Sequence, residues 1–351
     1  MTTDEIRVDS QKLKEFTRSV FSRAGLTDDV STVLADGLVT ANLRGVDSHG
    51  VVRLEPYTLK LERGGFNDSP NLSVTGTRSG TFRVDADDGP GQYATVEAMD
   101  RAVERAKEVG AAFAVVENSN HFGTAAYYTE RAAESDCIGF AMTNVGPNVA
   151  PFGGIDPYFG TNPLAYSIPT LESPTITLDM ATSVVAKGKI ILAEEEGESI
   201  PEEWVLDERG APTTDPSEFH ALRPVGGPKG YGLGLLVDVC SGLLSGMGSS
   251  PSVDSLYDDY AKPQRVGHFV GAIDVGAFRD VEAFKGDVET MISELKSQRT
   301  AEGVDEVLLP GEPEARIRAE RERDGIPLGD GVRETLSEIA ATYDLDTPWD
   351  G

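Results

Sequence analysis

The chain has 351 residues, of which 39% are hydrophobic, so it can bury a substantial core and is long enough for two or three domains. Its 59 acidic and 31 basic residues give a formal net charge of -28, spread along the chain, which excludes a nucleic-acid surface because phosphates would be repelled. Acidity spread in this way is typical of a halophilic protein, since a Debye length of about 3 Å at 1 M salt limits self-repulsion. No stretch approaches the roughly 18 apolar residues of a membrane span, and Cys137 and Cys240 lack CxxC spacing, so we expect a cytoplasmic protein without a disulfide framework.

Apolar residues recur at helical spacing near both ends of the chain. After a Ser10 cap, one predicted helix face carries Leu13, Phe16, Val20 and Phe21. After Asp330, a similar stripe comprises Val332, Leu336, Ile339 and Tyr343. We expect the C-terminal helices to pack back on the N-terminal ones.

The middle of the chain alternates between strand and helix patterns, which predicts α/β organisation. Strands are expected at residues 81–84, 112–117, 138–145, 164–168, 175–178, 268–274 and 306–309, and helices at 95–109 and 124–135. Residues 249–260 are polar and turn-rich, so we expect a mobile loop there.

The segment 45–54 brings a hydroxyl, an imidazole and a guanidinium close together, from Ser48, His49 and Arg53. A dehydrogenase of hydroxy acids needs an imidazole to take the hydroxyl proton, and an unperturbed pKa of about 6.5 suits both directions near neutrality. A fork-shaped cation such as Arg53 suits the substrate carboxylate. The competing interpretations are a helix-capping pair, Asp47 with Ser48, and a serine hydrolase, for which the GxSxG elbow is missing.

A second histidine, His121, lies in segment 118–123, where a predicted strand ends and a helix begins. Such a junction presents backbone N–H groups that suit a phosphate or carboxylate, and the histidine is either another acid/base group or a loop residue bonded to backbone. The other histidines besides His49 are His220 and His268, and the four form no HExxH or HxH pattern, so we expect no catalytic metal.

Two glycine-rich turns are candidate anion sites. Gly89–Ala94 matches GxGxxA, but it contains a proline and follows three aspartates, so we prefer an ordinary strand-to-helix turn to a Rossmann fingerprint. In the turn at 224–232, Lys229 and the backbone could both approach an anion, although the Walker A ending is missing and a plain helix-entry turn competes equally.

Eight segments, in this order, resemble the malate/L-lactate dehydrogenase type 2 family over nearly the whole chain. They are Arg44–Gly50, Asn118–Gly123, Gly160–Ala165, Leu178–Ser183, Lys187–Lys189, Pro212–Pro216, Gly227–Leu233 and Leu309–Pro313. The resemblance implies a non-Rossmann α/β fold. A mixed-sheet region at 71–309, as one unit or two subdomains, would bind cofactor and substrate, and residues 1–70 with 310–351 would form a helical domain. It also implies a homodimer.

By the same resemblance, His49 is the acid/base group with Ser48 hydrogen-bonded beside it, and His121 is the second candidate. Arg53 would hold the substrate carboxylate and Thr161 would touch the substrate. The residues implied to line NAD or NADP are His121, Phe122, Gly123, Thr124, Ala125, Asp179, Met180, Ala181, Lys229, Pro310, Gly311 and Glu312.

The sequence therefore predicts an NAD(P)-dependent oxidoreductase that moves a hydride between a nicotinamide cofactor and a small 2-hydroxy or 2-oxo acid of the malate, lactate or sulfolactate type. Two alternatives stay open: a cyclic imine reductase of the piperideine-2-carboxylate type, and a non-catalytic nucleotide-binding relative, which we would expect to lack His49 or Arg53. Lys189 joins the catalytic set because a lysine there is similar to the hydroxy-acid branch, whereas the imine reductase branch carries an aspartate. The acid and the choice between NAD and NADP stay open, because no ribose-binding fingerprint can be placed.

Overall fold

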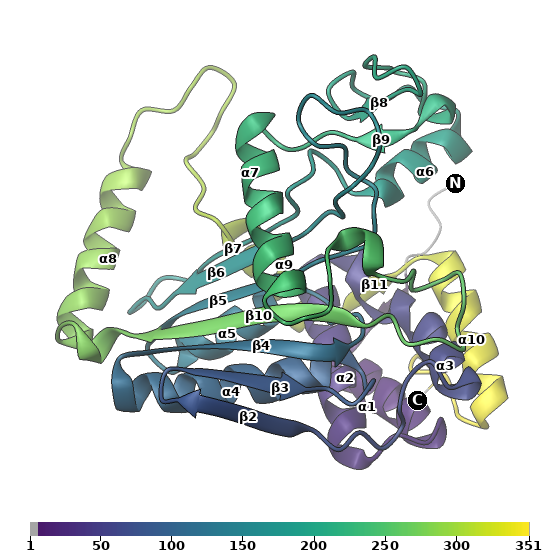
Figure 1. Cartoon of the computed structure of the whole chain (residues 1–351), viewed down its shortest axis with the longest axis horizontal. Helices are drawn as coiled ribbons and strands as arrows, with labels where there is room; N and C mark the ends of the chain where they lie inside the picture. The colour runs from purple at the N-terminus through teal and green to yellow at the C-terminus, as the bar shows by residue number, and fades with distance from the viewer. Residues whose placement is uncertain (1–5, 351) are drawn as a thin grey trace.

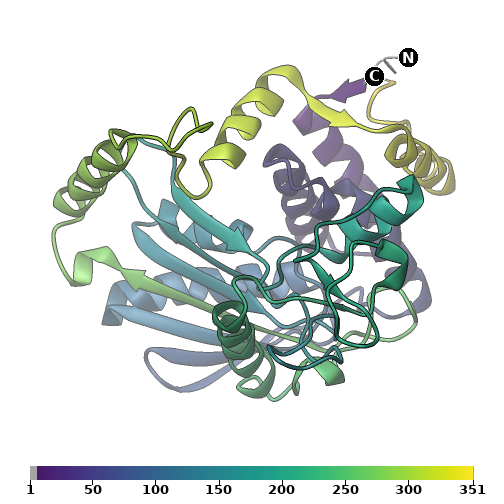
Figure 2. The same ribbon diagram turned by 90° about the horizontal axis from the view of Figure 1, so that it is seen from above.

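The computed structural model describes residues 6–350, apart from the side chain of Thr77. Two bodies lie side by side in both views of the ribbon (Figure 1, Figure 2). One is helical and is made from the two ends of the chain, coloured purple and yellow. The other is a sheet with flanking helices, made from the middle of the chain.

The helical domain joins both ends of the chain through main-chain pairing. It contains β1 (Ile6–Val8), α1 (Ser10–Arg23), α2 (Asp28–Leu43), α3 (Leu54–Arg63), α9 (Glu312–Asp324), β11 (Ile326–Leu328) and α10 (Asp330–Tyr343). Strands β1 and β11 pair antiparallel, and α1 packs against both α2 and α10. The expected return of the C-terminal helices to the N-terminal ones is confirmed.

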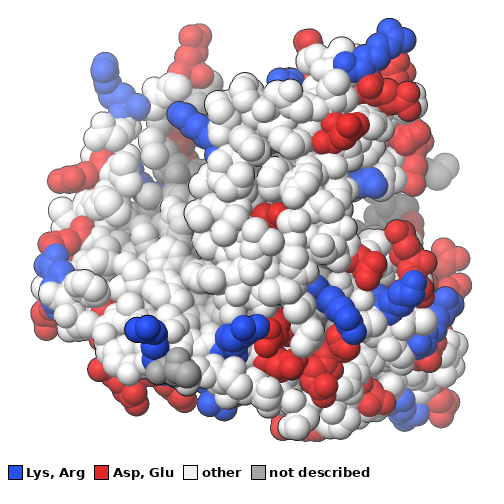
Figure 3. All heavy atoms as spheres, viewed as in Figure 1, with Lys and Arg blue, Asp and Glu red and all other residues white. Residues whose placement is uncertain are grey.

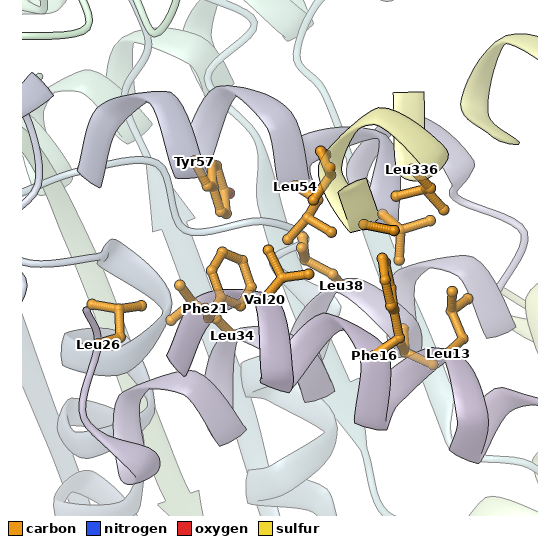
Figure 4. Packing of buried hydrophobic residues seen from close by; sticks show 14 of the residues in the cluster. Leu13, Phe16, Val20, Phe21, Leu26, Leu34, Leu38, Leu54, Tyr57 and Leu336 are labelled. Atoms are coloured by element: carbon orange, nitrogen blue, oxygen red, sulfur yellow. The ribbon is translucent and has the colours of Figure 1, made fainter. Parts of the chain in front are cut away.

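The core of this domain is built from the apolar faces that the sequence predicted (Figure 4). One cluster unites side chains of α1, α2, α3 and α10, including Leu13, Phe16, Val20, Phe21, Leu34, Leu38, Leu54, Tyr57 and Leu336. Each of these large side chains contributes roughly 1.5–3 kcal/mol when it is removed from water, so the cluster gives the turn between α2 and α3 a rigid base.

Seven strands form the central sheet in the order β2-β3-β4-β10-β5-β6-β7. Their bounds are β2 (Ser73–Arg78), β3 (Thr81–Asp85), β4 (Ala111–Ser119), β5 (Cys137–Thr143), β6 (Leu164–Ile168), β7 (Ile176–Met180) and β10 (Val266–Asp274). Strands β3 and β4 pair in parallel and the other neighbours pair antiparallel, so the predicted mixed, non-Rossmann α/β fold is confirmed.

The prediction of a strand at residues 306–309 is wrong, because this segment has no regular secondary structure. Leu309 is buried in a small cluster with Ile176 of β7 and two residues of α8 (Val281–Lys296). The hydrophobicity of this segment therefore reflects packing of Leu309. The segment contacts the sheet at the next residue, where Thr177 N of β7 donates to Pro310 O at 3.0 Å.

The two faces of the sheet differ in how they are covered. Helices α4 (Gly91–Val109) and α5 (Ala126–Glu134) lie behind it in Figure 1, against small buried side chains such as Ala114 and Ala141. The other side, here called the open sheet face, carries half-buried side chains: Phe113, Ile138, Phe140, Met142, Leu164, Tyr166, Phe269 and Ile273. Helix α7 (Pro228–Val237) and the π-helical turn η4 (Asp238–Leu243) lie on this side.

The remaining elements are short. A small unit before α7 contains α6 (Lys187–Glu196), β8 (Val205–Leu206) and β9 (Ala221–Leu222) around its own apolar cluster. The 3-10 helices are η1 (Asp47–His49), η2 (Val51–Arg53), η3 (Pro216–Glu218), η5 (Ser250–Ser252) and η6 (Val275–Ala277). No helix between residues 6 and 350 is both long and apolar enough to span a bilayer.

Candidate active site

The predicted catalytic residues lie on two consecutive 3-10 turns, η1 and η2, which are joined at Gly50. The side chain of Asn42 fills the space beside this glycine, since a Cβ there would lie 2.2 Å from Asn42 Oδ1. The same oxygen accepts the N–H of Val51 at 2.8 Å. Only glycine therefore allows α2 to hold the turn this closely.

Asp47, at the start of the turn, is fixed by the C-terminal part of the chain. Arg321 of α9 donates to both carboxylate oxygens of Asp47 at 2.6 and 2.9 Å, and Asn42 Nδ2 donates to one of them at 2.6 Å. The capping interpretation of Asp47 and Ser48 is wrong, because neither side chain caps η1. Asp47 instead ties this turn, which carries the predicted catalytic residues, to a helix that is far away in the sequence.

His49 and Arg53 point into one site. Ser48 Oγ lies 2.9 Å from Nδ1 of His49, and Arg53 Nε donates to the carbonyl oxygen of Ser48 at 2.7 Å. Within residues 6–350 no carboxylate pairs with Arg53, and its guanidinium lies 5.6 Å from the ring centre of Tyr257. The two terminal nitrogens of Arg53 are thus available for an anion.

His121 comes from the sheet domain and stacks on His49, with 5.6 Å between ring centres and 23° between ring planes. It follows the end of β4, and its backbone N–H donates to Gln264 Oε1 at 2.9 Å. Tyr57 Oη of α3 lies 2.6 Å from Nδ1 of His121. The sequence brought His49 and His121 forward as separate candidates, and the fold brings them together.

Tyr57 and Gln264 were missed by the sequence analysis. Tyr57 lies one helical turn after Arg53, and this spacing weakly predicts that the two side chains share a helix face. Its partner His121 is 64 positions away, and Gln264 is 143 positions beyond His121, which local spacing cannot reveal.

Both imidazoles are poor proton binders in this environment. Burial, and then the charge of Arg53, lower the pKa of His49 to about 4. Burial also lowers the pKa of His121 well below its ordinary value, with His49 and Arg53 acting in the same direction. At neutral pH both rings are neutral, unlike the ring of ordinary pKa assumed from the sequence.

A third histidine, His268, supports the site from inside the sheet. It is fully buried, with Thr143 Oγ1 and Ser119 Oγ each 2.8 Å from a ring nitrogen, and it stacks on Phe122 at 4.6 Å. Burial lowers the pKa of His268 to about 3. Across residues 6–350, no three His, Cys, Asp or Glu side chains are grouped as a metal site would require.

The segments expected to line the cofactor gather near this end of the sheet. Asp179, at the end of β7, accepts the first N–H of α5 from Ala126 at 2.8 Å, which places Asp179–Ala181 beside the loop 121–125. At this strand-to-helix junction, where an anion site was expected, the carboxylate of Asp179 accepts the N–H of the helix. Gly311 lies against Thr177 so closely that a Cβ would be 2.7 Å from the Thr177 oxygen, which puts the turn Pro310–Glu312 at the edge of β7.

One orphaned atom fits a cofactor in this region. Thr124 Oγ1 is buried and has no hydrogen-bond partner in the described part of the chain, so it offers a polar contact inside the loop 121–125. The neighbouring Phe122 side chain stacks on His268, its carbonyl oxygen accepts from Tyr128 Oη, and the N–H of Gly123 donates to His121 Nδ1 at 3.3 Å. The unpartnered hydroxyl of Thr124 is thus the group in this loop that suits a polar contact with a nicotinamide nucleotide.

Thr161 and helix α7, which carries Lys229, lie beside the same region. The carbonyl oxygen of Thr161 accepts the N–H of Thr182 at 2.8 Å, and α7 joins this layer through Gly234 O, which accepts from Asn162 Nδ2 at 3.1 Å. Lys229 is exposed in the first turn of α7. Lys189 is exposed on α6, and within residues 6–350 no hydrogen bond links it to either histidine.

The turn Gly89–Ala94 is structural. Helix α4 begins at Gly91, where a Cβ would lie 2.0 Å from the Asn120 oxygen, so this glycine is needed for close packing of two chain segments. Asn120 Nδ2 donates to Asp88 O and Gly89 O at 2.8 and 3.0 Å. The preference for a plain turn over a Rossmann fingerprint is confirmed.

Two neutral imidazoles beside an available guanidinium suit removal of a proton from a hydroxyl group that is close to a carboxylate. That is the chemistry of a 2-hydroxy acid dehydrogenase.

Comparison with known proteins places the chain in the same class. A family model described as "Malate/L-lactate dehydrogenase" matches residues 8–337. The chain is 39% identical to the malate dehydrogenase of Pyrococcus horikoshii, in an alignment that covers 95% of each chain. It is 34% identical to the ureidoglycolate dehydrogenase (NAD(+)) of Escherichia coli O157:H7, covering 98% of this chain and 99% of that one.

The solved structure of sulfolactate dehydrogenase from Methanocaldococcus jannaschii superposes with a TM-score of 0.92 at 34% identity, covering 97% of this chain and 98% of that one. A more distant relative, 31% identical, is the Delta(1)-pyrroline-2-carboxylate/Delta(1)-piperideine-2-carboxylate reductase of Pseudomonas putida. The chain belongs to the malate/L-lactate dehydrogenase family. It is an oxidoreductase of 2-hydroxy and 2-oxo acids that uses NAD or NADP.

Proposed function

We propose that the stacked pair His49 and His121, together with Arg53, forms the catalytic centre for the reversible oxidation of a small 2-hydroxy acid of the malate, lactate or sulfolactate type. The observation that carries this proposal is the 5.6 Å stack of two neutral imidazoles next to a guanidinium with no carboxylate partner among the described residues. In the oxidation the Cα–H and O–H bonds break and a C=O bond forms. A bound nicotinamide cofactor would supply the hydride acceptor, and the protein would accept the proton.

His49 is the proton acceptor in this proposal. If Nδ1–H of His49 donates to Ser48 Oγ, 2.9 Å away, Nε2 is left unprotonated and can take the hydroxyl proton. His121 has the opposite tautomer, because the backbone N–H of Gly123 donates to its Nδ1 at 3.3 Å and Tyr57 Oη can donate to the same nitrogen. His121 Nε2–H would then donate a hydrogen bond to the substrate oxygen.

Arg53 would bind the substrate carboxylate through its two terminal nitrogens, since its Nε is already bonded to Ser48 O. Thr161 would contact the substrate from the sheet side. The cofactor would lie along His121–Ala125, Asp179–Ala181 and Pro310–Glu312, with the Lys229 ammonium and the N-terminus of α7 near its phosphates.

Reduction of a cyclic imine is the competing activity, because one relative carries that name. The relatives named as hydroxy-acid dehydrogenases share more of this sequence, and the pairing of a proton acceptor with a carboxylate-binding arginine suits a hydroxy acid. We therefore favour the hydroxy acid and place Lys189 with that branch. A purely nucleotide-binding role is disfavoured, because His49 and Arg53 are both present in one site.

The deciding experiment is absorbance at 340 nm with purified protein in molar KCl. NAD or NADP would be offered with malate, lactate, sulfolactate and ureidoglycolate, and the reduced cofactors with the matching oxo acids and with piperideine-2-carboxylate. We expect turnover of one hydroxy/oxo pair. Turnover of the imine alone would replace this proposal with the reductase, and cofactor binding without any turnover would favour the binding role.

We also propose that the protein is a homodimer that buries the open sheet face. The exposed leucines of α7 and the following turn border this face, namely Leu235, Leu236, Leu243 and Leu244, which are 42 to 59% exposed. Figure 3 shows that the centre of this side of the molecule carries few charged side chains, while the charges gather at its rim. Exposed apolar side chains gathered on one face are typical of an interaction site, and a face with few charges adds least to the repulsion between two copies of charge -28.

Light scattering during gel filtration in 2 M KCl tests the dimer. We expect twice the 37.5 kDa chain mass, and a monomer for the double variant Leu236→Glu with Leu243→Glu. Val109→Glu is the control, because Val109 is 48% exposed at the end of α4, on the other side of the sheet. A double variant that stays dimeric would place the interface elsewhere.

The charge of -28 further supports a halophilic, cytoplasmic enzyme. Both cysteines are free, which fits a reducing compartment where nicotinamide cofactors are recycled. We expect the melting temperature and the activity to rise as KCl is increased from 0.1 M to 2 M, because salt screens the repulsion between carboxylates. A melting temperature that does not change with salt would argue against the halophilic assignment.

A further inference from the structure

Residues 253–265, here called the strap, connect η5 to β10 and run from the sheet domain onto the helical domain. The sequence predicted a mobile loop over most of this segment. In the structure, Leu256 is only 5% exposed and belongs to the core cluster of the helical domain. At the other end, Gln264 N donates to Asn120 Oδ1 at 2.7 Å, and Gln264 Oε1 accepts the N–H of His121. The strap therefore bridges the two domains at the candidate active site.

Lys60 is the most unusual anchor of the strap. This lysine of α3 is fully buried, and its ammonium donates to two main-chain carbonyl oxygens of the strap, those of Asp259, at 3.1 Å, and Lys262. A buried ammonium normally pairs with a carboxylate. Here both hydrogen bonds go to backbone, while the carboxylates of Asp254 and Asp259 act on the ammonium through their charge, and all four groups belong to the strap.

The end of α3 is shaped for this contact. A Cβ at Gly65 would lie 2.3 Å from the Tyr260 oxygen and 2.7 Å from the side chain of Lys60, so only glycine lets the strap approach. Arg63 lies over the ring of Tyr260 at 5.4 Å. Anchoring is thus concentrated on one turn of α3, directly after Tyr57, which contacts His121.

The anchored strap places Tyr257 against Arg53. The ring of Tyr257 lies 5.6 Å from the guanidinium carbon and remains 49% exposed, so it shields one face of the arginine without closing the site. An ion pair between Arg53 and a carboxylate strengthens when water is excluded from it. A side chain in this position controls how much water reaches the pair.

We propose that the strap forms the wall of the substrate site at the carboxylate end, that Tyr257 contacts the bound acid or its arginine partner, and that Lys60 is the positioning residue that holds this wall in place. The inference rests on the proposed role of Arg53 in binding the substrate carboxylate. It assigns to the strap an effect on the affinity for the acid, and none on the cofactor or on proton transfer by His49.

The test combines steady-state kinetics with limited proteolysis of the full-length enzyme. For Lys60→Met we expect the KM for the acid to rise about tenfold or more, with kcat and the cofactor KM changed less than about threefold. Chymotrypsin should cut the strap after Tyr257 or Tyr260 about tenfold faster than in the unmodified protein, because a released segment becomes accessible. Tyr257→Ala, a change at a half-exposed side chain that should fold normally, should raise the KM for the acid in the same way.

Two variants serve as matched controls. Asp258→Ala lies in the strap but removes an exposed side chain that makes no hydrogen bond or ion pair within the described residues. Lys107→Met removes another lysine, which bonds Asp274 at 2.5 Å at the far end of β10 from His268. Both should leave the KM for the acid and the cleavage rate of the strap unchanged.

An unchanged cleavage rate in Lys60→Met would overturn the anchoring role. Faster cleavage with an unchanged KM for the acid, or an unchanged KM in Tyr257→Ala, would overturn the assignment of the strap to the substrate site. If the unmodified enzyme turned over no acid at all, the proposed function would fail instead, and cleavage would still decide whether Lys60 anchors the strap.

Discussion

Replacement of each stacked histidine by glutamine separates the two roles assigned to them. At pH 7 a group with a pKa of about 4 is protonated in roughly one molecule in a thousand, so His49 is in the unprotonated form that a general base requires. Glutamine cannot accept it. Since general base catalysis is worth about 10²–10⁴-fold, His49→Gln should lower kcat by that factor, which is about 2.7–5.5 kcal/mol of barrier.

His121→Gln should be milder, because glutamine retains an N–H that can donate to the substrate oxygen. The loss should be limited to about tenfold, or about 1.4 kcal/mol, which is the size of one imperfect hydrogen bond. The assay is the rate of cofactor reduction at saturating acid in 2 M KCl, with the quenching of protein fluorescence by NADH as a check that cofactor affinity is kept. A near-normal rate for His49→Gln with a loss of 100-fold or more for His121→Gln would refute the tautomer argument and make His121 the base.

Three further outcomes follow from the same geometry. Because His49 must be neutral to accept a proton and its pKa is lowered to about 4, kcat/KM for oxidation should stay flat from about pH 5.5 to 8, and an inflection near 6.5 would contradict the burial of the ring. Arg53→Lys should raise the KM for the acid about tenfold with little change in kcat, because a point charge replaces a two-pronged donor; an equal fall in kcat would argue against a ground-state carboxylate contact. His268 has a pKa of about 3 in the folded protein and about 6.5 in the unfolded chain. Its contribution to the free energy of unfolding is therefore fully present above pH 6.5 and is lost as the pH falls toward 3, with about 2 kcal/mol lost by pH 5. Urea unfolding of His268→Gln in molar salt should therefore change about 2 kcal/mol less between pH 7 and pH 5 than unfolding of the unmodified protein, and an equal change would show that His268 is not the group responsible.

The sequence could predict those site residues that lie close together along the chain. His49 and Arg53 lie four residues apart, so their spacing alone predicts that an imidazole and a guanidinium lie close together. Gln264 could not be found in this way, because its contact with His121 depends on the pairing of β10 with β4. Contacts across a sheet are fixed by strand order, which residue spacing along the chain does not encode.

The pKa values differ from the sequence expectation for a physical reason. An isolated imidazole titrates near 6.5, but desolvation disfavours its charged form, and stacking places a second ring and Arg53 close by. The sequence contains the groups but not their burial. Enclosure therefore turns a group suited to both directions into one that is strongly biased toward the neutral, proton-accepting form.

The segment 249–260 shows the limit of reading mobility from composition. Its serines, aspartates and tyrosines are typical of an exposed loop, yet Leu256 enters the core of the other domain and the buried Lys60 bonds the backbone. Fixing a polar segment costs about 1–2 kcal/mol of backbone entropy per residue, and here that cost is offset by burial of Leu256 together with hydrogen bonds from Lys60 and Gln264.

The division of the site between two bodies has a consequence for substrate choice. His49 and Arg53 belong to the helical domain, where Arg321 of α9 and Asn42 of α2 hold the turn that carries them. His121 belongs to the sheet domain, and Tyr57 with the strap joins the two. In the proposed function, the acid's carboxylate and hydroxyl would be bound at the junction by groups that suit any 2-hydroxy acid, while its side chain would extend toward surfaces supplied by the strap and by Thr161. Changes in those two segments would alter the preferred acid and leave the hydride chemistry intact.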